Sequence, residues 1–189
     1  MNEVLDVIAK RYSCRGFGSR PVSRADLETI TKAGVQAPSS RGNAPWYLAV
    51  VTHRGLIDEI RDSAFAVIKR RDLEGHQRIL DRGGDLFYNA QALIVVATKP
   101  THDLTPAEFD AGLLTENICL AAHSIGLGTC ICGFATHAFH VFASPDGERF
   151  SRRLEIPYGY QMTVGILVGH PVQTKEPHPA DTSVIRFFE

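Results

Sequence analysis

Two arginines flank a serine in the segment Arg11-Tyr-Ser-Cys-Arg15, close to the N-terminus. A guanidinium group can donate two parallel hydrogen bonds to the oxygens of a phosphate, and the hydroxyl of Ser13 adds a further donor. This combination favours binding of an anion such as a phosphate. Arginines so close together are also common on solvated surfaces, so the segment by itself leaves both interpretations open.

A second stretch, from Ala37 to Trp46, combines turn-forming residues with the large, flat, apolar side chain of a tryptophan. Pro38 ends the preceding helical pattern, and short polar side chains that bend or satisfy the backbone follow it at Ser39, Ser40 and Asn43. With the indole beside them, these groups suit the wall of a site for a flat, partly polar ligand. An ordinary helix-to-strand loop with a buried tryptophan is the competing interpretation, and local chemistry alone favours it.

Other ligand-binding motifs fail at identifiable positions. Gly126-Leu-Gly128 begins a dinucleotide-type pattern, but Ile131 stands where that pattern requires its third glycine. The motif also follows a helical pattern and precedes a strand, which is the reverse of the required order. The sequence contains no G-x-S-x-G elbow and no P-loop. These absences argue against a Rossmann dehydrogenase, an α/β-hydrolase and a P-loop NTPase.

The four cysteines, at positions 14, 119, 130 and 132, do not form a disulfide framework in a chain of this length. Cys130 and Cys132 are two apart on a predicted strand and so project to the same face. His137 and His140 are spaced acceptably for a metal on a helix, but scattered histidines are usually surface or packing residues. We therefore expect no metal site.

The bulk composition is that of a globular protein without a dominant charge. A chain of 189 residues is long enough for one domain, 1–189, with a full core. The formal net charge of −1 gives no reason to expect nucleic acid or a membrane as a partner. No apolar run reaches the ~20 residues that span a bilayer. The acidic, amphipathic start lacks the pattern of a signal peptide, and we expect a cytoplasmic protein.

Hydrophobic periodicity predicts a mixture of helices and strands. Apolar residues at helical spacing predict helices at 2–10, 23–37, 56–71, 105–125 and 137–154, the last broken at 144–147. Apolar, β-branched runs predict strands at 47–53, 92–98, 129–134 and 162–168. The charged stretch 71–85 is typical of a mobile loop or short helix beside a site, or of a plain solvated connection.

The predicted helix 105–125 is unusually apolar. Thr105, followed by Pro106 and Glu108, is a strong helix-start pattern, and Gly126 ends the helix. At 1.5 Å per residue the helix is about 30 Å long, and a single chain has difficulty covering all of its apolar circumference. We expect part of it to face a second subunit. The apolar tail, about 172–189, is expected to pack on that partner.

The chain resembles the FMN-dependent nitroreductase family from about residue 3 to about residue 172. The resemblance rests on the order of four segments: Arg11-Tyr-Ser-Cys-Arg15, Ala37-Pro-Ser-Ser…Pro-Trp46, Thr115-Glu-Asn117 and Gly126-Leu-Gly-Thr-Cys-Ile-Cys-Gly133. It implies an α+β fold with a mostly antiparallel central sheet flanked by helices, in an intertwined homodimer. It also implies an oxidoreductase in which NADH or NADPH reduces FMN. Flavin N5 then passes the hydride to a nitroaromatic or quinone-like acceptor in a ping-pong sequence.

The resemblance also implies roles for individual residues. Arg11 and Ser13 would lie near the FMN phosphate, and Arg15 near the N1–C2=O edge, where its charge would stabilise the reduced flavin. A main-chain N–H of 129–134 would point at N5. No side chain needs to act as an acid, base or nucleophile, because the cofactor carries the chemistry. The implied cofactor-binding residues are Arg11, Tyr12, Ser13, Arg15, Pro38, Ser39, Ser40, Asn43, Ile131, Cys132, Gly133, Lys175 and His178.

Two departures from the family pattern concern the cofactor. Gly42-Asn43-Ala44 stands where the family has an Asn followed by a Gln, which puts a side-chain contact with the flavin pyrimidine in question. Lys175 and His178 are the candidates where the family has paired basic residues, and a histidine is a weaker, pH-sensitive substitute. Two alternatives therefore stand beside the enzyme: a flavin-binding sensor or store without significant turnover, and a structural dimer without a cofactor.

Overall fold

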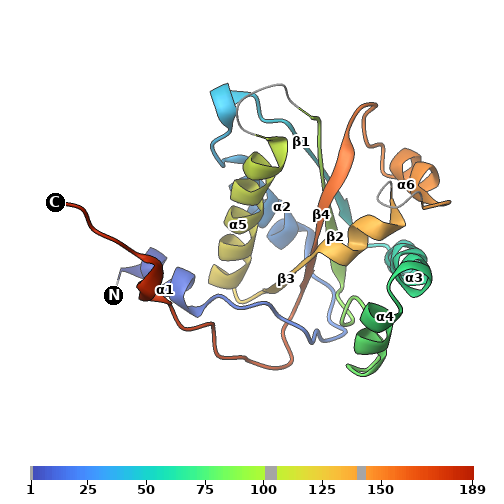
Figure 1. Ribbon diagram of the computed structural model, residues 1–189, viewed down its shortest axis with the longest axis horizontal. Coiled ribbons are helices and arrows are strands. Elements are labelled where there is room, and N and C mark those ends of the chain that lie inside the picture. Colours follow the sequence, from blue (N-terminus) through green and yellow to red (C-terminus); the bar gives the residue numbers. More distant parts are fainter. Residues whose placement is uncertain (1, 101–105, 140–143) are drawn as a thin grey trace.

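Four antiparallel strands form one central sheet (Figure 1). The computed structural model describes residues 2–100, 106–139 and 144–189. The strands are β1 (Trp46–Val51), β2 (Ala92–Thr98), β3 (Gly128–Cys132) and β4 (Gln161–Gly169), in the spatial order β1-β2-β4-β3. Each neighbouring pair is antiparallel. The predicted α+β fold with an antiparallel sheet is confirmed.

Helices cover both faces of this sheet (Figure 1). On one face, α2 (Arg24–Val35) and α5 (Ala107–Ser124) pack against each other. The helices on the opposite side are α3 (Arg54–Arg71), α4 (Leu73–Leu80), the 3-10 helix η2 (Gly133–Ala138) and α6 (Gly147–Arg153). The protein therefore has two cores, one on each side of the strands.

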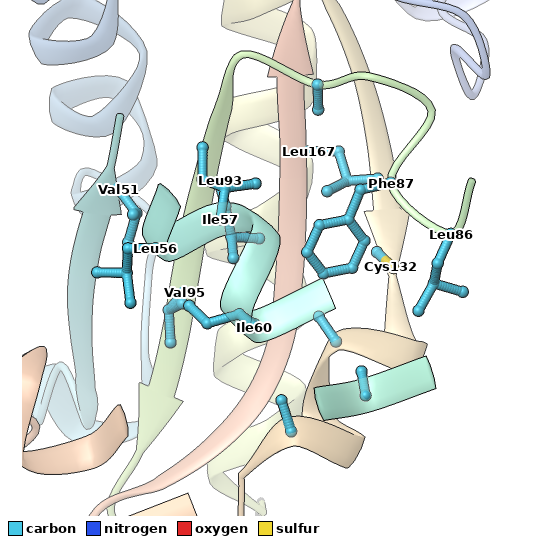
Figure 2. Packing of buried hydrophobic residues seen from close by; sticks show 14 of the residues in the cluster. Val51, Leu56, Ile57, Ile60, Leu86, Phe87, Leu93, Val95, Cys132 and Leu167 are labelled. Atoms are coloured by element: carbon cyan, nitrogen blue, oxygen red, sulfur yellow. The ribbon is translucent and has the colours of Figure 1, made fainter. Parts of the chain in front are cut away.

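Strand β2 is buried on both faces because it separates these two cores. Leu93 and Val95 belong to the core under α3, whereas Ile94 belongs to the core under α2 and α5. Successive side chains of a strand point to opposite faces, so a continuous apolar run suits an interior strand. Figure 2 shows Ile57 and Ile60 of α3 packed over Leu93 and Val95. The predicted interior strand is confirmed.

The core under α3 extends to the region where the candidate site lies. Phe87 is fully buried beside Leu167 of β4, and Leu86 and Cys132 lie next to it (Figure 2). Dense packing of this kind fixes the positions of the neighbouring backbone segments. This packed core thus supports the residues that line the site.

The approach of α2 to α5 depends on Gly34. A Cβ atom at this position would lie 2.5 Å from Cγ1 of Ile118 on α5, so a larger residue would push the helices apart. The start of α2 follows the predicted pattern, since the hydroxyl of Ser23 accepts a hydrogen bond of 3.0 Å from the backbone N–H of Asp26. Local capping and tertiary packing agree at this helix.

The charged stretch after α3 contains the short helix α4. Its N-cap, Asp72, accepts a hydrogen bond of 2.8 Å from the backbone N–H of Gly75. A short helix was one of the expected structures for this stretch. The described residues contain no helix with both the length and the apolar character needed to cross a membrane.

Two predicted boundaries need correction. The strand predicted at 129–134 ends at Cys132, and Gly133 begins the 3-10 helix η2 instead of lying inside the strand. In the predicted helix 137–154, the described α-helix is α6. A short apolar run is compatible with both the helical and the strand periodicity. The packing of η2 against α3 determines that the segment after Cys132 is a 3-10 helix. The predicted N-cap Thr105 lies outside the described residues, and α5 begins at Ala107.

The two chain ends lie on the same side of the protein, away from the sheet (Figure 1). Helix α1 (Glu3–Lys10) has no buried residue, and the tail contains a 3-10 turn, η3 (Thr182–Val184). Large apolar side chains are exposed on α1, on α5 and in the tail; they are Val4, Leu5, Ile8, Phe109, Val172, Val184, Ile185, Phe187 and Phe188. The predicted packing of the tail on a partner stays a prediction.

Candidate functional site

The segment 11–18 is held between β3 and the chain that follows β4. Ser13 forms an isolated parallel bridge with Thr129, and the backbone N–H of Cys14 donates to the carbonyl of Thr129 at 2.8 Å. On the other side, the N–H of Val172 donates to the carbonyl of Gly16 at 3.1 Å. Cys14 is fully buried in the core, whereas Ser13 before it is half-buried and Arg15 after it is exposed.

One hollow of about 330 Å³, here called the Arg15 hollow, lies beside this segment. Three parts of the chain form its walls: the N-terminal segment, the β3–η2 junction and the stretch between α4 and β2. The residues that line it are Arg15, Arg82, Leu86, Tyr88, Cys130, Ile131, Cys132, Gly133, Phe134 and His137. The structure thus brings together four of the predicted site residues, namely Arg15, Ile131, Cys132 and Gly133.

The β3–η2 junction presents backbone rather than reactive side chains to the Arg15 hollow. The space where a Cβ of Gly133 would lie holds no atom within 4 Å. Cys132 is buried, and this burial raises the pKa of its thiol to about 12. The thiol is therefore protonated at neutral pH and is a poor nucleophile. The open surface at the glycine suits a flat ring lying against the main chain.

A strained turn places Tyr88 at the hollow. Tyr88 and Asn89 both have positive φ angles, 53° and 62°, which non-glycine residues rarely adopt. Asp85 holds the turn by accepting hydrogen bonds from the backbone N–H groups of Phe87 and Asn89. Burial raises the pKa of Tyr88, and the nearby positive charge of Arg15 acts in the opposite direction. The turn therefore places Tyr88 in the same hollow as the Arg15 guanidinium.

A second hollow of about 570 Å³, here called the Arg11 hollow, lies between α1, the N-terminal segment and the tail. Arg11, Tyr12, Ser13 and His178 line it, so four more predicted residues are brought together. The Tyr12 hydroxyl donates to the carbonyl of Gln173 at 3.0 Å, which ties the tail to the segment. Arg11 thus offers guanidinium donors and Ser13 a hydroxyl donor to an anion, and one acid, Glu176, also lines the hollow.

The guanidinium of Arg11 is oriented by α5. Its Nε lies 3.1 Å from Oε1 of Glu116, a residue of the Thr-Glu-Asn motif. His123, near the end of α5, stands edge-on to the Tyr12 ring at 6.3 Å between centroids. Burial, and then the charge of Arg11, lower the pKa of His123. Lys175 is exposed in the tail and is not part of the lining of either hollow.

Four further predicted residues, Pro38, Ser39, Ser40 and Asn43, belong to a turn that contacts the start of α5 and not the Arg15 hollow. Ser40 donates its backbone N–H to both carboxylate oxygens of the buried Asp110, at 3.2 Å each, in the first turn of α5. The Ser39 hydroxyl accepts from the N–H of Ala44 at 2.9 Å. Within one chain, Pro38, Ser39, Ser40 and Asn43 are not part of the lining of the Arg15 hollow.

Sequence reasoning missed several residues of the site. Arg82, Leu86, Tyr88, Phe134 and His137 line the Arg15 hollow, and Asp110 anchors the serine turn. One of the two interpretations of 71–85, a loop or short helix beside a site, covers Arg82 without naming it. His140 lies outside the described residues, and the described part of the chain holds no group of three or more His, Cys, Asp or Glu arranged for a metal.

Comparison with known proteins places the chain in a family. The profile described as "Nitroreductase family" matches residues 8–170. The chain belongs to the nitroreductase family. It is 39% identical to a nitroreductase with bound FMN from Desulfitobacterium hafniense DCB-2, with all of both chains covered and a TM-score of 0.94. The likeness to a nitroreductase with bound FMN from Bacteroides fragilis, at 22% identity and a TM-score of 0.86, supports the fold.

A sequence relative extends the comparison to the archaea. A protein of Archaeoglobus fulgidus with the provisional name NADH dehydrogenase/NAD(P)H nitroreductase is 29% identical over 187 residues, covering 96% of this chain and 92% of that protein. The nitroreductase fold that the four sequence segments implied is therefore confirmed. Family membership supports an oxidoreductase.

Proposed function

We propose that this protein is an FMN-dependent oxidoreductase of the cytoplasm that uses NADH or NADPH to reduce a nitroaromatic or quinone-like acceptor. The observation that carries the proposal is the pair of hollows on either side of the segment 11–15. One has the donors for a phosphate, and the other has the open backbone for a ring. The bound FMN of the Desulfitobacterium nitroreductase, similar over the whole chain, supports the same cofactor here.

The residues present fit FMN. Arg11, Ser13 and His178 would hold the phosphate, and Arg15 would lie at the electron-rich edge of the ring. The missing side chain at Gly133 leaves room for the ring beside the main chain. When bound, FMN would supply the hydride chemistry, with N5 as the reacting atom. A fixed guanidinium stabilises the negative charge that reduction creates more effectively than mobile water does.

The protein's own contribution is positional and electrostatic. Arg15 lines the hollow together with Tyr88, and the Cys132 thiol is protonated and buried. We therefore propose no side-chain nucleophile, acid or base. Ile131, Cys132 and Gly133 would contribute their backbone to the ring site. Oxidation of the nicotinamide and reduction of the acceptor would use the same face in alternation, as a ping-pong sequence requires.

A homodimer would complete the site. Pro38, Ser39, Ser40 and Asn43 lie apart from the Arg15 hollow of their own chain, so in this proposal they serve the partner's hollow. Phe109 on α5 is 60% exposed and Phe188 in the tail is 94% exposed. Burying such apolar side chains favours association by roughly 1.5–3 kcal/mol each before the costs of association. The tail, about 172–189, would pack on the second subunit.

A flavin sensor or store without turnover is the second candidate. It is favoured by the turn at Ala44, whose side chain cannot replace a glutamine amide and whose N–H is already bonded to Ser39. The exposed Lys175 likewise offers no second fixed cation for the phosphate. Such a protein would bind FMN but turn over slowly.

The test combines a spectrum with an assay. Protein purified and reconstituted with FMN should be yellow and release up to one FMN per chain on denaturation. It should then oxidise NADH or NADPH when 4-nitrobenzamide or a benzoquinone is supplied. Flavin without turnover would favour the store. Absence of any bound flavin after reconstitution would overturn both flavin proposals and leave a structural dimer.

A further inference from the structure

Arg82 is a second guanidinium in the Arg15 hollow, and it is not one of the proposed flavin-binding residues. It lies in the turn that ends α4, where the backbone N–H of Arg82 donates to the carbonyl of Ile79 at 3.1 Å. The N–H of Gly84 donates to the same carbonyl at 3.0 Å. This hydrogen-bonded turn holds Arg82 at the wall formed by the stretch between α4 and β2.

The guanidinium of Arg82 is not held by a partner within the part of the chain that the structure describes. Across residues 2–100, 106–139 and 144–189, its guanidinium has no hydrogen bond or ion pair. The nearest acids in the sequence are engaged elsewhere. Asp81 accepts from Nε2 of Gln77 at 2.9 Å, and Asp85 accepts from the N–H of Phe87 at 2.9 Å. None of the described residues that line the hollow is an aspartate or glutamate.

The other polar groups of the hollow leave Arg82 as the cation available to a second ligand. Arg15 lies near Tyr88 and, in the proposed function, faces the flavin. His137 also lines the hollow, but burial is the main cause that lowers its pKa, so it is mostly uncharged at neutral pH. A guanidinium in a site without acids attracts anions.

We propose that Arg82 binds an anionic substituent on the ring of the electron acceptor, so that acceptors carrying a carboxylate are preferred over neutral ones. The inference rests on the proposed function, since the acceptor must reach the flavin in the Arg15 hollow. The 2′-phosphate of NADPH is another anion, but a pyrophosphate and two riboses separate it from the nicotinamide ring. A residue in the lining of a hollow of about 330 Å³ is within reach of a group on the ring itself.

The test compares Arg82→Gln and Arg82→Lys with Arg78→Gln. Arg78 is a matched control because it lies on α4, is paired with Asp72 and Glu74 at 3.6 Å, and does not line the hollow. One readout needs no turnover: calorimetric titration of the purified protein with benzoate and with benzamide. The second is the KM for 4-nitrobenzoate and 4-nitrobenzamide, each with NADH and with NADPH.

Arg82→Gln should weaken benzoate binding about tenfold, as expected for one charged hydrogen-bonding partner, and should leave benzamide unchanged. The KM for 4-nitrobenzoate should rise by a similar factor. Arg82→Lys should retain part of the preference, Arg78→Gln should behave as the parent, and added salt should weaken benzoate selectively.

Four results would overturn the inference. The affinity for benzoate could be unchanged in Arg82→Gln, or the KM for both acceptors could rise equally. The rise in KM could also be confined to assays with NADPH. Loss of FMN or a changed flavin potential in Arg82→Gln would instead assign the guanidinium to the cofactor and would also overturn it. Failure of the proposed function is separate: it would appear as a parent protein that binds no flavin or does not reduce 4-nitrobenzamide, while the benzoate titration still decides the role of Arg82.

Discussion

Nε of Arg11 lies 3.1 Å from Oε1 of Glu116, which joins the N-terminal segment to the middle of α5. Both side chains are partly exposed, 29% and 45%, so the pair contributes about 1 kcal/mol or less to stability. Its more important effect is orientation. The contact uses Nε and leaves the two terminal nitrogens of the guanidinium for an anion in the Arg11 hollow.

Arg11→Ala should therefore weaken FMN binding by about 10- to 100-fold, because a hydrogen bond from a charged group contributes roughly 1.5–3 kcal/mol. Glu116→Gln should have a smaller effect, since it loosens the guanidinium without removing it. Arg24→Ala is the control, because Arg24 forms an exposed pair with Glu28 and lines neither hollow. Fluorescence titration of FMN measures all three. Parental affinity in Arg11→Ala would show that Arg11 is a surface residue.

Arg15→Ala should lower the reduction potential of the bound flavin. The positive charge favours the reduced, anionic cofactor, so its loss should shift the potential downward by tens of millivolts; about 30 mV corresponds to roughly 1.4 kcal/mol for a two-electron couple. Arg20→Ala, an exposed arginine outside the lining of the hollow, is the control. Equilibrium titration against a redox dye measures the shift. An unchanged potential in Arg15→Ala would remove the electrostatic role.

Cys132 should be chemically silent. Its pKa of about 12 means that the thiolate is scarce at pH 7–8, and alkylation requires the thiolate. Iodoacetamide should leave the folded protein active and unmodified at this position, as mass spectrometry of digests would reveal. Cys132→Ala should keep its kcat within about twofold, with a stability loss of roughly 1 kcal/mol for one small buried group. Rapid inactivation by iodoacetamide that is abolished by Cys132→Ala would contradict this assignment.

The stability of the protein should fall in mild acid because of His123 and His137. Burial lowers the pKa of both below the ordinary value of 6.5, so the unfolded chain takes up these protons first. Their contribution to stability is complete above pH 6.5 and is lost as the pH falls toward the folded-state values. Urea unfolding between pH 7.5 and 5.5 should show this slope, and His123→Gln with His137→Gln should flatten it. An equal slope in the double variant would assign the proton uptake to other groups.

The sheet could be predicted from the sequence because its strands are apolar runs whose composition allows few alternatives. The run Ala92–Thr98 has the bounds of β2, since both of its faces are buried. The segment after Cys132 could not be assigned in the same way. Its residues are compatible with both a strand and a helix, because the run is short. The contact of η2 with α3, which is distant in sequence, makes it a 3-10 helix.

The candidate site could be predicted in part for the same reason. Arg15 and Gly133 were implied by the family resemblance, although their proximity arises from the bridge between Ser13 and Thr129, which no local pattern indicates. Tyr88 was missed because its place depends on a left-handed turn at a non-glycine residue. Sequence rules predict left-handed turns from Gly and Asn, so they do not identify a tyrosine in that conformation.

The exposed side of α5 provides the sharpest test of the homodimer. Phe109 and Gly112 are three residues apart and so lie on one face of the helix, and the space where a Cβ of Gly112 would lie holds no atom within 4 Å. Gly112→Trp should therefore leave the chain folded while blocking close approach of a partner. Sedimentation should give twice the chain mass of 20.8 kDa for the parent. The variant should shift toward the single-chain mass, with a dissociation constant raised about 100-fold or more, or roughly 2.7 kcal/mol. Ala66→Trp, at an exposed position of α3 on the opposite side of the sheet, is the control and should remain dimeric. If Gly112→Trp sediments as the parent does, this face of α5 is not the interface, and the serine turn would need another route to a second subunit.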